Sequence, residues 1–124
     1  MNKNLVITAT IGILTIILGA FGTHALAEKL SVDSIKSFET AVEYQMYHVL
    51  ALLFSNTYKG FSNKTKKYIS ILFFCGILFF SGSIYLITIG GISAKSIWFI
   101  TPLGGLSFIA GWMLILINFL KRKS

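Results

Sequence analysis

Long uncharged stretches constrain this chain more than any other feature of its sequence. Residues 5–27, 68–89 and 97–120 contain no Asp, Glu, Lys or Arg, and residues 44–58 form a shorter fourth stretch without charge. A helix of about 20 apolar residues crosses the hydrocarbon core of a bilayer, which is ~30 Å thick. Three of the stretches reach that length, which predicts a small multi-pass membrane protein.

The composition and the short connections predict a single domain. Hydrophobic residues make up 55% of the chain and charged residues 12%, about half of the charged share in soluble domains. The expected helices cover roughly residues 4–27, 33–57, 66–90 and 97–121. The connections between them leave no room for a separate soluble domain. The expected fold is therefore all-α, an integral membrane antiparallel four-helix bundle that comprises residues 1–124.

The N-terminal stretch has two interpretations. Lys3 precedes the apolar run, and Ala-Leu-Ala at residues 25–27 ends it, which is the pattern of a signal peptide with a small-x-small cleavage site. The run is longer than the apolar region of an ordinary signal peptide, and it contains Gly12, Gly19 and Gly22. An uncleaved first transmembrane helix is the preferred interpretation, with cleavage as the alternative.

The basic residues flank the apolar stretches, and this placement predicts an orientation. In a four-span chain, eight basic residues fall on one side: Lys3, Lys59, Lys64, Lys66, Lys67, Lys121, Arg122 and Lys123. The other side has Lys29, Lys36 and Lys95. The positive-inside rule then places both termini in the cytoplasm. The net charge of +7 is accordingly assigned to topology and to contact with anionic membrane lipids, and nucleic acid is not an expected partner.

The expected second helix has two different faces. One face is apolar and contains Phe38, Val42, Met46, Val49, Leu50 and Leu53. The other face is polar or small and contains Thr40, Tyr44, Tyr47, His48, Ala51 and Ser55. Within a membrane, the apolar face is expected to contact lipid and the polar face to contact neighbouring helices.

Two histidines are the first candidates for chemistry. His24 ends the first expected helix and His48 lies inside the second, where ionisable groups usually face the protein interior and are functional suspects. A metal or haem site needs further ligands, and the sequence has no His-x-x-x-His pair and no cysteine partner. Cys75 is the single cysteine and is interpreted as an inert buried thiol. We expect no metal or cofactor, and two interior imidazoles hydrogen-bonded to Tyr44, Gln45 or nearby hydroxyl groups.

The sequence does not predict an enzyme. Glu39 and Glu43 are one helical turn apart, and paired carboxylates can perform acid–base catalysis. Here they lie near the start of a helix beside Lys36, so a solvated helix start that suits the helix dipole is the preferred interpretation. The pair Gly104-Gly105 lacks the strand and the spacing of a nucleotide-binding loop.

Small residues predict close helix packing. Glycines in or near the expected spans include Gly19, Gly22, Gly76, Gly82, Gly104, Gly105 and Gly111, and such residues let membrane helices approach each other. Packing inside one chain is the preferred interpretation, and a lipid-facing dimer seam is the alternative. A leucine in place of Gly82 is then expected to separate two helices and to disrupt folding.

Four short blocks give the chain a family resemblance. GAFGTHA at residues 19–25, YQMYH at 44–48, FSGSIY at 80–85 and TPLGG at 101–105 occur in that order, one block per expected helix. Together they resemble the signature blocks of the family called domain of unknown function 423, related to transmembrane protein 256. Thr23 stands where the family often has alanine. The resemblance implies a small four-helix protein of the bacterial cytoplasmic membrane, and it supplies no reaction.

These observations give two hypotheses about function. The residues expected to form a polar interior seam are His24, Tyr44, Gln45, His48, Ser81, Ser83, Tyr85 and Thr101. The leading hypothesis is a non-enzymatic binding, accessory or lipid-organising protein, with membrane lipids, another membrane protein or a second copy as partners. The alternative is a transport component for protons or small molecules that uses His24 and His48. Transport predicts a hydrated cavity that reaches both leaflets, whereas an accessory role predicts a dry core and an exposed helix-packing surface.

Overall fold

The computed structural model describes residues 2–121, whose regular secondary structure is helical, with turns between the helices and without a strand. The prediction of an all-α protein is therefore confirmed. Three helical stretches are long and apolar enough to cross a membrane: Lys3–Leu26, Asn63–Thr88 and Ile100–Lys121. They correspond to the three long uncharged stretches of the sequence. The fourth expected span coincides with a helix that is less apolar, because it contains Asp33, Lys36, Glu39 and Glu43.

The helical elements form four rods and one short helix. The first rod consists of α1, the π-helical segment η1 and α2, and the third consists of α4, the π-helical segment η2 and α5. In chain order the elements are α1 (Lys3–Ile17), η1 (Leu18–Gly22), α2 (Thr23–Leu26), α3 (Val32–Thr57), α4 (Asn63–Gly76), η2 (Ile77–Ser81), α5 (Gly82–Thr88), α6 (Ala94–Ile97) and α7 (Ile100–Lys121).

Side-chain caps explain where the helices begin. Ser31 accepts a hydrogen bond from the backbone N–H of Ser34 at 3.1 Å and so starts α3. Ser62 does the same for Thr65 at 3.1 Å, which is why α4 begins at Asn63 rather than near residue 66 as expected. Such caps satisfy backbone donors that the first helical turn leaves without partners.

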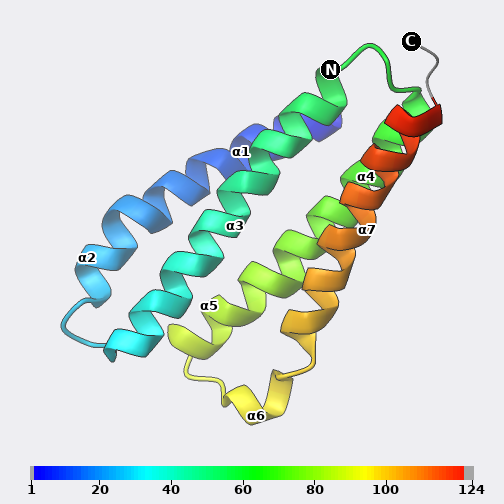
Figure 1. Ribbon diagram of the computed structural model, residues 1–124. Coiled ribbons are helices and arrows are strands. Elements are labelled where there is room, and N and C mark those ends of the chain that lie inside the picture. The colour runs from blue at the N-terminus through cyan, green and yellow to red at the C-terminus, as the bar shows by residue number, and fades with distance from the viewer. Residues whose placement is uncertain (1, 122–124) are drawn as a thin grey trace.

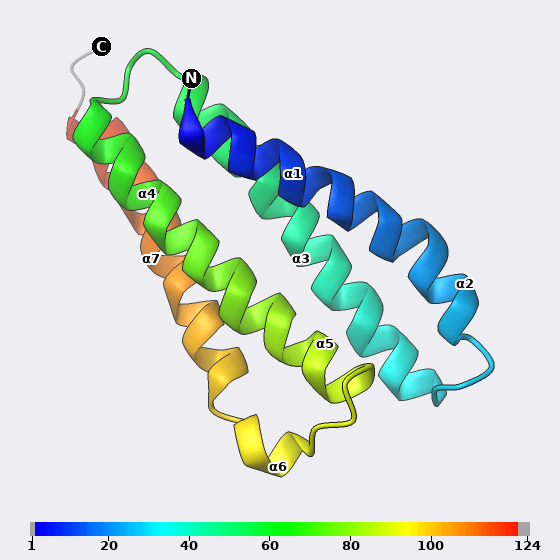
Figure 2. The same ribbon diagram turned by 180° about the vertical axis from the view of Figure 1, so that it is seen from behind.

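The rods lie side by side and alternate in direction (Figure 1, Figure 2). The start of α1, the α3–α4 connection and the end of α7 lie at one end of the molecule, whereas the α2–α3 connection and α6 lie at the other. The rod of α1 packs on α3, and α3 also packs on α4 and α5, while α7 packs on α4 and η2. The buried core lies mainly between α3, α4 and α7, where Leu52, Ile69, Phe73 and Phe108 meet.

The predicted division of α3 into a lipid face and an interior face is partly wrong. Phe38 and Val49 were expected to face lipid, but they are 0% and 4% exposed. Tyr44 and Tyr47 were expected to face inward, but they are 39% and 53% exposed. The reason is that α3 contacts α1 on one side and α4 with α5 on the other. The surface that α3 buries therefore includes parts of both the apolar face and the polar face.

Glycines allow close approach at specific points. A Cβ atom on Gly104 would lie 2.7 Å from Phe80 Cα, so α7 and η2 meet there backbone to backbone. A Cβ atom on Gly111 would lie 2.7 Å from Cδ1 of Phe73. In the α1–α3 contact, Gly22 leaves room for the ring of Phe38 and Gly19 leaves room for Val42.

Two of the predicted packing glycines lie in open surroundings. The nearest atom to a Cβ on Gly82 would be 3.9 Å away, and nothing would lie within 4 Å of a Cβ on Gly105. The prediction that a leucine at Gly82 separates two helices is therefore wrong. The Ser-Gly-Ser pattern around Gly82 indicates a helix surface of small side chains. In the structure Gly82 faces a groove, described below, and not the backbone of a neighbouring helix.

Candidate functional site

The imidazole of His48 lies between α3 and α7 with both ring nitrogens engaged. Nδ1 lies 2.7 Å from the carbonyl oxygen of Tyr44, and the indole N–H of Trp112 donates to Nε2 at 3.0 Å. Because an indole nitrogen can only donate, Nε2 must be the unprotonated acceptor. The hydrogen is then on Nδ1, which donates it to Tyr44. These partners select one neutral tautomer of His48.

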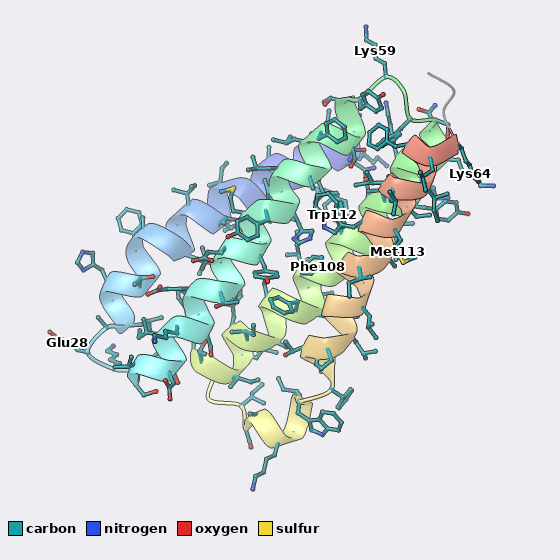
Figure 3. The ribbon with its side chains drawn as sticks, viewed as in Figure 1. Glu28, Lys59, Lys64, Phe108, Trp112 and Met113 are labelled. Atoms are coloured by element: carbon teal, nitrogen blue, oxygen red, sulfur yellow. The ribbon has the colours of Figure 1, made fainter. Side chains whose placement is uncertain are left out.

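Aromatic rings enclose the same imidazole. Phe108 stacks on it with a centroid distance of 3.6 Å and an interplanar angle of 11°, and Phe73 meets it edge-on at 5.0 Å. Phe108 and Trp112 project from α7 toward α3 (Figure 3). No group of three or more His, Cys, Asp or Glu that could hold a metal ion occurs among residues 2–121. The surroundings of His48 therefore support a packed, hydrogen-bonded imidazole.

A second polar contact joins three rods through Gln45. The side-chain amide of Gln45 donates to Oγ1 of Thr15 at 2.7 Å, and the hydroxyl of Tyr85 donates to Oε1 of Gln45 at 2.7 Å. Thr15 in turn donates to the carbonyl oxygen of Ile11 at 2.6 Å. Gln45 is 4% exposed. The contact links α1, α3 and α5 inside an otherwise apolar region.

Further hydroxyl contacts connect the remaining elements. Ser81 donates to the carbonyl oxygen of Ala41 at 2.8 Å and so joins η2 to α3. Ser83 pairs with Thr101 and joins α5 to α7. Each of these hydroxyl groups is satisfied within the protein, which low-polarity surroundings require.

The predicted seam of eight residues is not continuous. Gln45 and Tyr85 are brought together, Ser83 and Thr101 form a separate pair, and His48 has partners of its own. His24 is exposed at the end of α2, so the prediction that it lies in the interior is wrong. Its position follows from helix geometry, because His24 lies two residues, or about 200°, beyond Gly22, which faces α3.

The sequence analysis missed several residues that complete these contacts. Thr15 and Trp112 were not expected to take part, and neither was Asn56, which donates to Ser70 at 2.9 Å and accepts from Asn4 at 3.2 Å. The position of Trp112 in the sequence could have indicated its role. Tryptophan favours membrane interfaces, so a tryptophan in the middle of an apolar helix needs a partner for its N–H. Thr15 gave no such signal, because threonines in helices commonly bond their own backbone.

An apolar groove opens between α1 and the rod formed by α4, η2 and α5. Its volume is about 650 Å³, and it is lined by aliphatic side chains of α1 and of η2, together with Phe74, Gly82 and Tyr85. Gln45 of α3 forms part of its floor. The two rods stand on either side of α3 (Figure 2), so the groove follows from the arrangement of the helices.

The acidic residues lie away from the end of the molecule that contains the α3–α4 connection. Lys59 and Lys64 lie at the end that contains the α3–α4 connection, and Glu28 lies at the opposite end (Figure 3). The four acidic residues of the chain, Glu28, Asp33, Glu39 and Glu43, belong to the α2–α3 connection and to α3. Arg122 and Lys123, which contribute to the predicted basic side, lie outside the described residues.

The family model described as "Protein of unknown function (DUF423)" matches residues 18–105. The chain belongs to the DUF423 family. The matched region contains all four sequence blocks that suggested the resemblance. It includes His48, Gln45 and Tyr85, whereas Thr15 and Trp112 lie outside it.

Relatives of the chain are membrane proteins by name. It is 42% identical over 103 residues to UPF0382 membrane protein SH2409 of Staphylococcus haemolyticus, covering 83% of each chain. It is 35% identical over 127 residues to UPF0382 inner membrane protein YgdD of Escherichia coli, covering 96% of this chain and 90% of the relative. No solved structure was found to match the chain. With its three apolar helices, the chain is a helical membrane protein of an uncharacterised family.

Proposed function

We propose that the protein is a non-enzymatic membrane protein that binds an apolar molecule within the bilayer. The observation that carries this proposal is the groove of about 650 Å³ between α1 and the α4–α5 rod. A volume of this size is typical of small-molecule sites. The groove is lined by apolar side chains that would lie at the depth of the lipid tails, so the molecule that it holds comes from the hydrocarbon phase.

The proposed arrangement in the membrane is a single domain, an antiparallel four-helix bundle in which α3 is the fourth span. Polar groups within a span must find partners inside the protein. Gln45 and His48 of α3 have such partners, since Gln45 bonds Thr15 and Tyr85 while His48 bonds Trp112 and a backbone carbonyl. This supports a position within the membrane for the part of α3 that follows Glu43, despite the lower hydropathy of the helix. The name of the Escherichia coli relative supports the bacterial cytoplasmic membrane as the location.

The orientation gives a first prediction. A fusion of alkaline phosphatase after residue 124 should be inactive, and a fusion of green fluorescent protein at the same point should fluoresce, because the basic end should remain in the cytoplasm. The control is a pair of fusions after Gly91, in the connection between α5 and α6, where the phosphatase should be active. Phosphatase activity from the fusion after residue 124 would contradict the four-span orientation.

The binding function gives a second prediction. Protein extracted in a mild detergent should retain an apolar molecule at a ratio near one per chain, measured by native mass spectrometry and by analysis of the extracted organic phase. A Leu78→Trp variant should retain much less, since Leu78 lines the groove and is 65% exposed, so a larger side chain fits without disturbing the core. Leu106→Trp, at an exposed position outside the groove, is the control. Equal retention by both variants would overturn the proposed function.

Transport with two histidines has less support. His24 is exposed at the end of α2, and His48 is enclosed by Phe73, Phe108 and Trp112 with both nitrogens occupied. A proton carrier needs a nitrogen that is free to exchange its hydrogen. Exchange at His48 would first require breaking a hydrogen bond to Trp112 or to the backbone.

A further inference from the structure

The apolar groove extends toward the basic end of the molecule. Its lining on the first rod runs from Ile7 to Leu18, and the opposite wall includes Phe74 of α4. Ile7 and Phe74 are the lining residues nearest to the starts of α1 and α4. These two starts lie at the same end of the molecule (Figure 2). Residues at the starts of both helices are therefore in a position to contact a molecule that the groove holds.

Two lysines lie on the groove-lining faces of these helices. Lys3 precedes Ile7 by four residues, about one turn, and so shares its face of α1. Lys67 precedes Phe74 by seven residues, about two turns, and shares its face of α4. Both lysines are exposed. One ammonium group therefore lies on each side of the groove at its basic end.

A hydrogen-bonded bridge holds the two helix starts close together. Asn4 donates to Asn56 at 3.2 Å, and Asn56 donates to Ser70 at 2.9 Å. Asn4 follows Lys3 directly, and Ser70 is one turn after Lys67. Asn56 is buried, so the bridge spans the gap between α1 and α4 from the α3 side. The two long lysine side chains are thus near enough to approach one phosphate group together.

No carboxylate side chain lies beside these lysines. The four acidic residues of the chain all fall between Glu28 and Glu43. Glu43 precedes Asn56 by thirteen residues of α3, which is ~20 Å along the helix. Lysines at a membrane surface attract anionic lipid headgroups. The charge at this end of the groove therefore suits a negatively charged group from outside the protein.

The groove itself suits one acyl chain. From Ile7 to Leu18 its lining rises ~16 Å, at ~1.5 Å per residue, and one acyl chain covers about half of the ~30 Å hydrocarbon core. The polar lining residues Gln45 and Tyr85 bond each other, and Gln45 also bonds Thr15. The remaining lining is apolar. A plain hydrocarbon tail satisfies such a surface, and the lysines select its headgroup.

We infer that the groove holds one acyl chain of an anionic phospholipid whose phosphate lies between Lys3 and Lys67. This inference rests on the proposed binding function and names its ligand. A lipid without charge would leave both ammonium groups unmatched. A zwitterionic phospholipid would bring its own cation to them. A phospholipid with net negative charge, such as phosphatidylglycerol, matches the groove and both lysines at once.

The test uses the whole protein in nanodiscs that contain equal amounts of phosphatidylglycerol and phosphatidylethanolamine with identical acyl chains. Native mass spectrometry measures which lipid the released protein retains. Wild-type protein should retain phosphatidylglycerol in about tenfold excess, and Lys3→Gln combined with Lys67→Gln should reduce the excess to about twofold or less. Lys3→Arg combined with Lys67→Arg should keep the excess, because arginine keeps the charge and binds phosphate.

A charge-matched control comes from the same end of the molecule. Lys59 and Lys64 project away from the helices (Figure 3), and neither lines the groove. Lys59→Gln combined with Lys64→Gln removes the same charge and should keep the preference of the wild type. Equal losses in the two glutamine pairs would show only a diffuse attraction to the basic end and would overturn the assignment to Lys3 and Lys67. An unchanged preference in Lys3→Gln with Lys67→Gln would overturn it as well.

The groove variant separates this inference from the proposed function. Leu78→Trp should lose most of the bound phosphatidylglycerol, and Leu106→Trp should retain it, because Leu78 lines the groove and Leu106 does not. If Leu78→Trp loses a bound molecule that shows no preference for a negative headgroup, the ligand class is wrong and the binding function stands. If Leu78→Trp instead abolishes a dimer, a second copy covers the groove and the phospholipid assignment is wrong. If Leu78→Trp and Leu106→Trp retain every lipid equally, both the inference and the proposed function fail.

Discussion

Replacing Gly104 with alanine is expected to lower the free energy of unfolding by about 3 kcal/mol, the upper end of the usual cost of overpacking. The added Cβ would lie 2.7 Å from Phe80 Cα and 2.8 Å from the carbonyl carbon of Phe79. A backbone cannot rotate away as a side chain can, so α7 and η2 would have to move apart. The loss would appear as a lower unfolding midpoint in detergent, followed by circular dichroism.

The neighbouring glycine supplies the control for this measurement. A Cβ on Gly105 would have nothing within 4 Å, so Gly105→Ala should leave stability unchanged or raise it by up to ~1 kcal/mol, since alanine favours helix. Both substitutions add one methyl group to the first half of α7, and they differ in what that group meets. Equal stability of the two variants would show that α7 and η2 do not approach at Gly104.

Replacing His48 with leucine is expected to cost about 1–3 kcal/mol. The change leaves the indole N–H of Trp112 without its acceptor and removes the ring that stacks on Phe108. Glutamine at the same position can keep one hydrogen bond, so His48→Gln should be closer to wild type. Unfolding in increasing concentrations of a denaturing detergent would rank the three proteins, and a leucine variant as stable as wild type would contradict the described contact.

A double-mutant cycle isolates the hydrogen bond itself. Trp112→Phe removes the indole donor while keeping an aromatic ring, and it can be combined with His48→Leu. Interhelical hydrogen bonds measured this way in a membrane protein average ~0.6 kcal/mol and reach ~1.7 kcal/mol, so a coupling in this range is expected. Strictly additive effects would show that His48 and Trp112 do not interact.

The apolar helices could be predicted from the sequence because length and lack of charge are local properties. The uncharged stretches correspond to α1 through α2, α4 through α5, and α7. The π-helical segments η1 and η2 could not be predicted, since the residues that form them are ordinary helix-compatible residues. The separation of α6 from α7 was also missed, because the sequence between Ile97 and Ile100 is as apolar as the helix that follows.

The candidate site could be predicted only in part, because its geometry depends on how the helices rotate about their axes. Gln45 and Tyr85 were both expected inside, but their pairing requires α3 and α5 to face each other at that height. The glycine pattern did not distinguish Gly82 from Gly104, although one lines a groove and the other touches a backbone. The position of His24 was predicted wrongly for the same reason, because His24 lies two residues beyond Gly22 and therefore faces away from α3.

The contacts of α3 with α1 also bear on how the protein enters its membrane. Gln45 bonds Thr15, and Asn56 bonds Asn4, so both amides have partners within the first half of the chain. We therefore expect a nascent chain that has delivered only α1 through α3 to the insertion machinery to release this pair into lipid as one unit, with one partner of each amide already in place, whereas Tyr85 and Ser70 complete these contacts later. The hydrogen bond between Trp112 and His48 can form only later, because α7 is the last helix to be synthesised. The C-terminal pair is then expected to dock onto a hairpin that is already in place and to complete the interior.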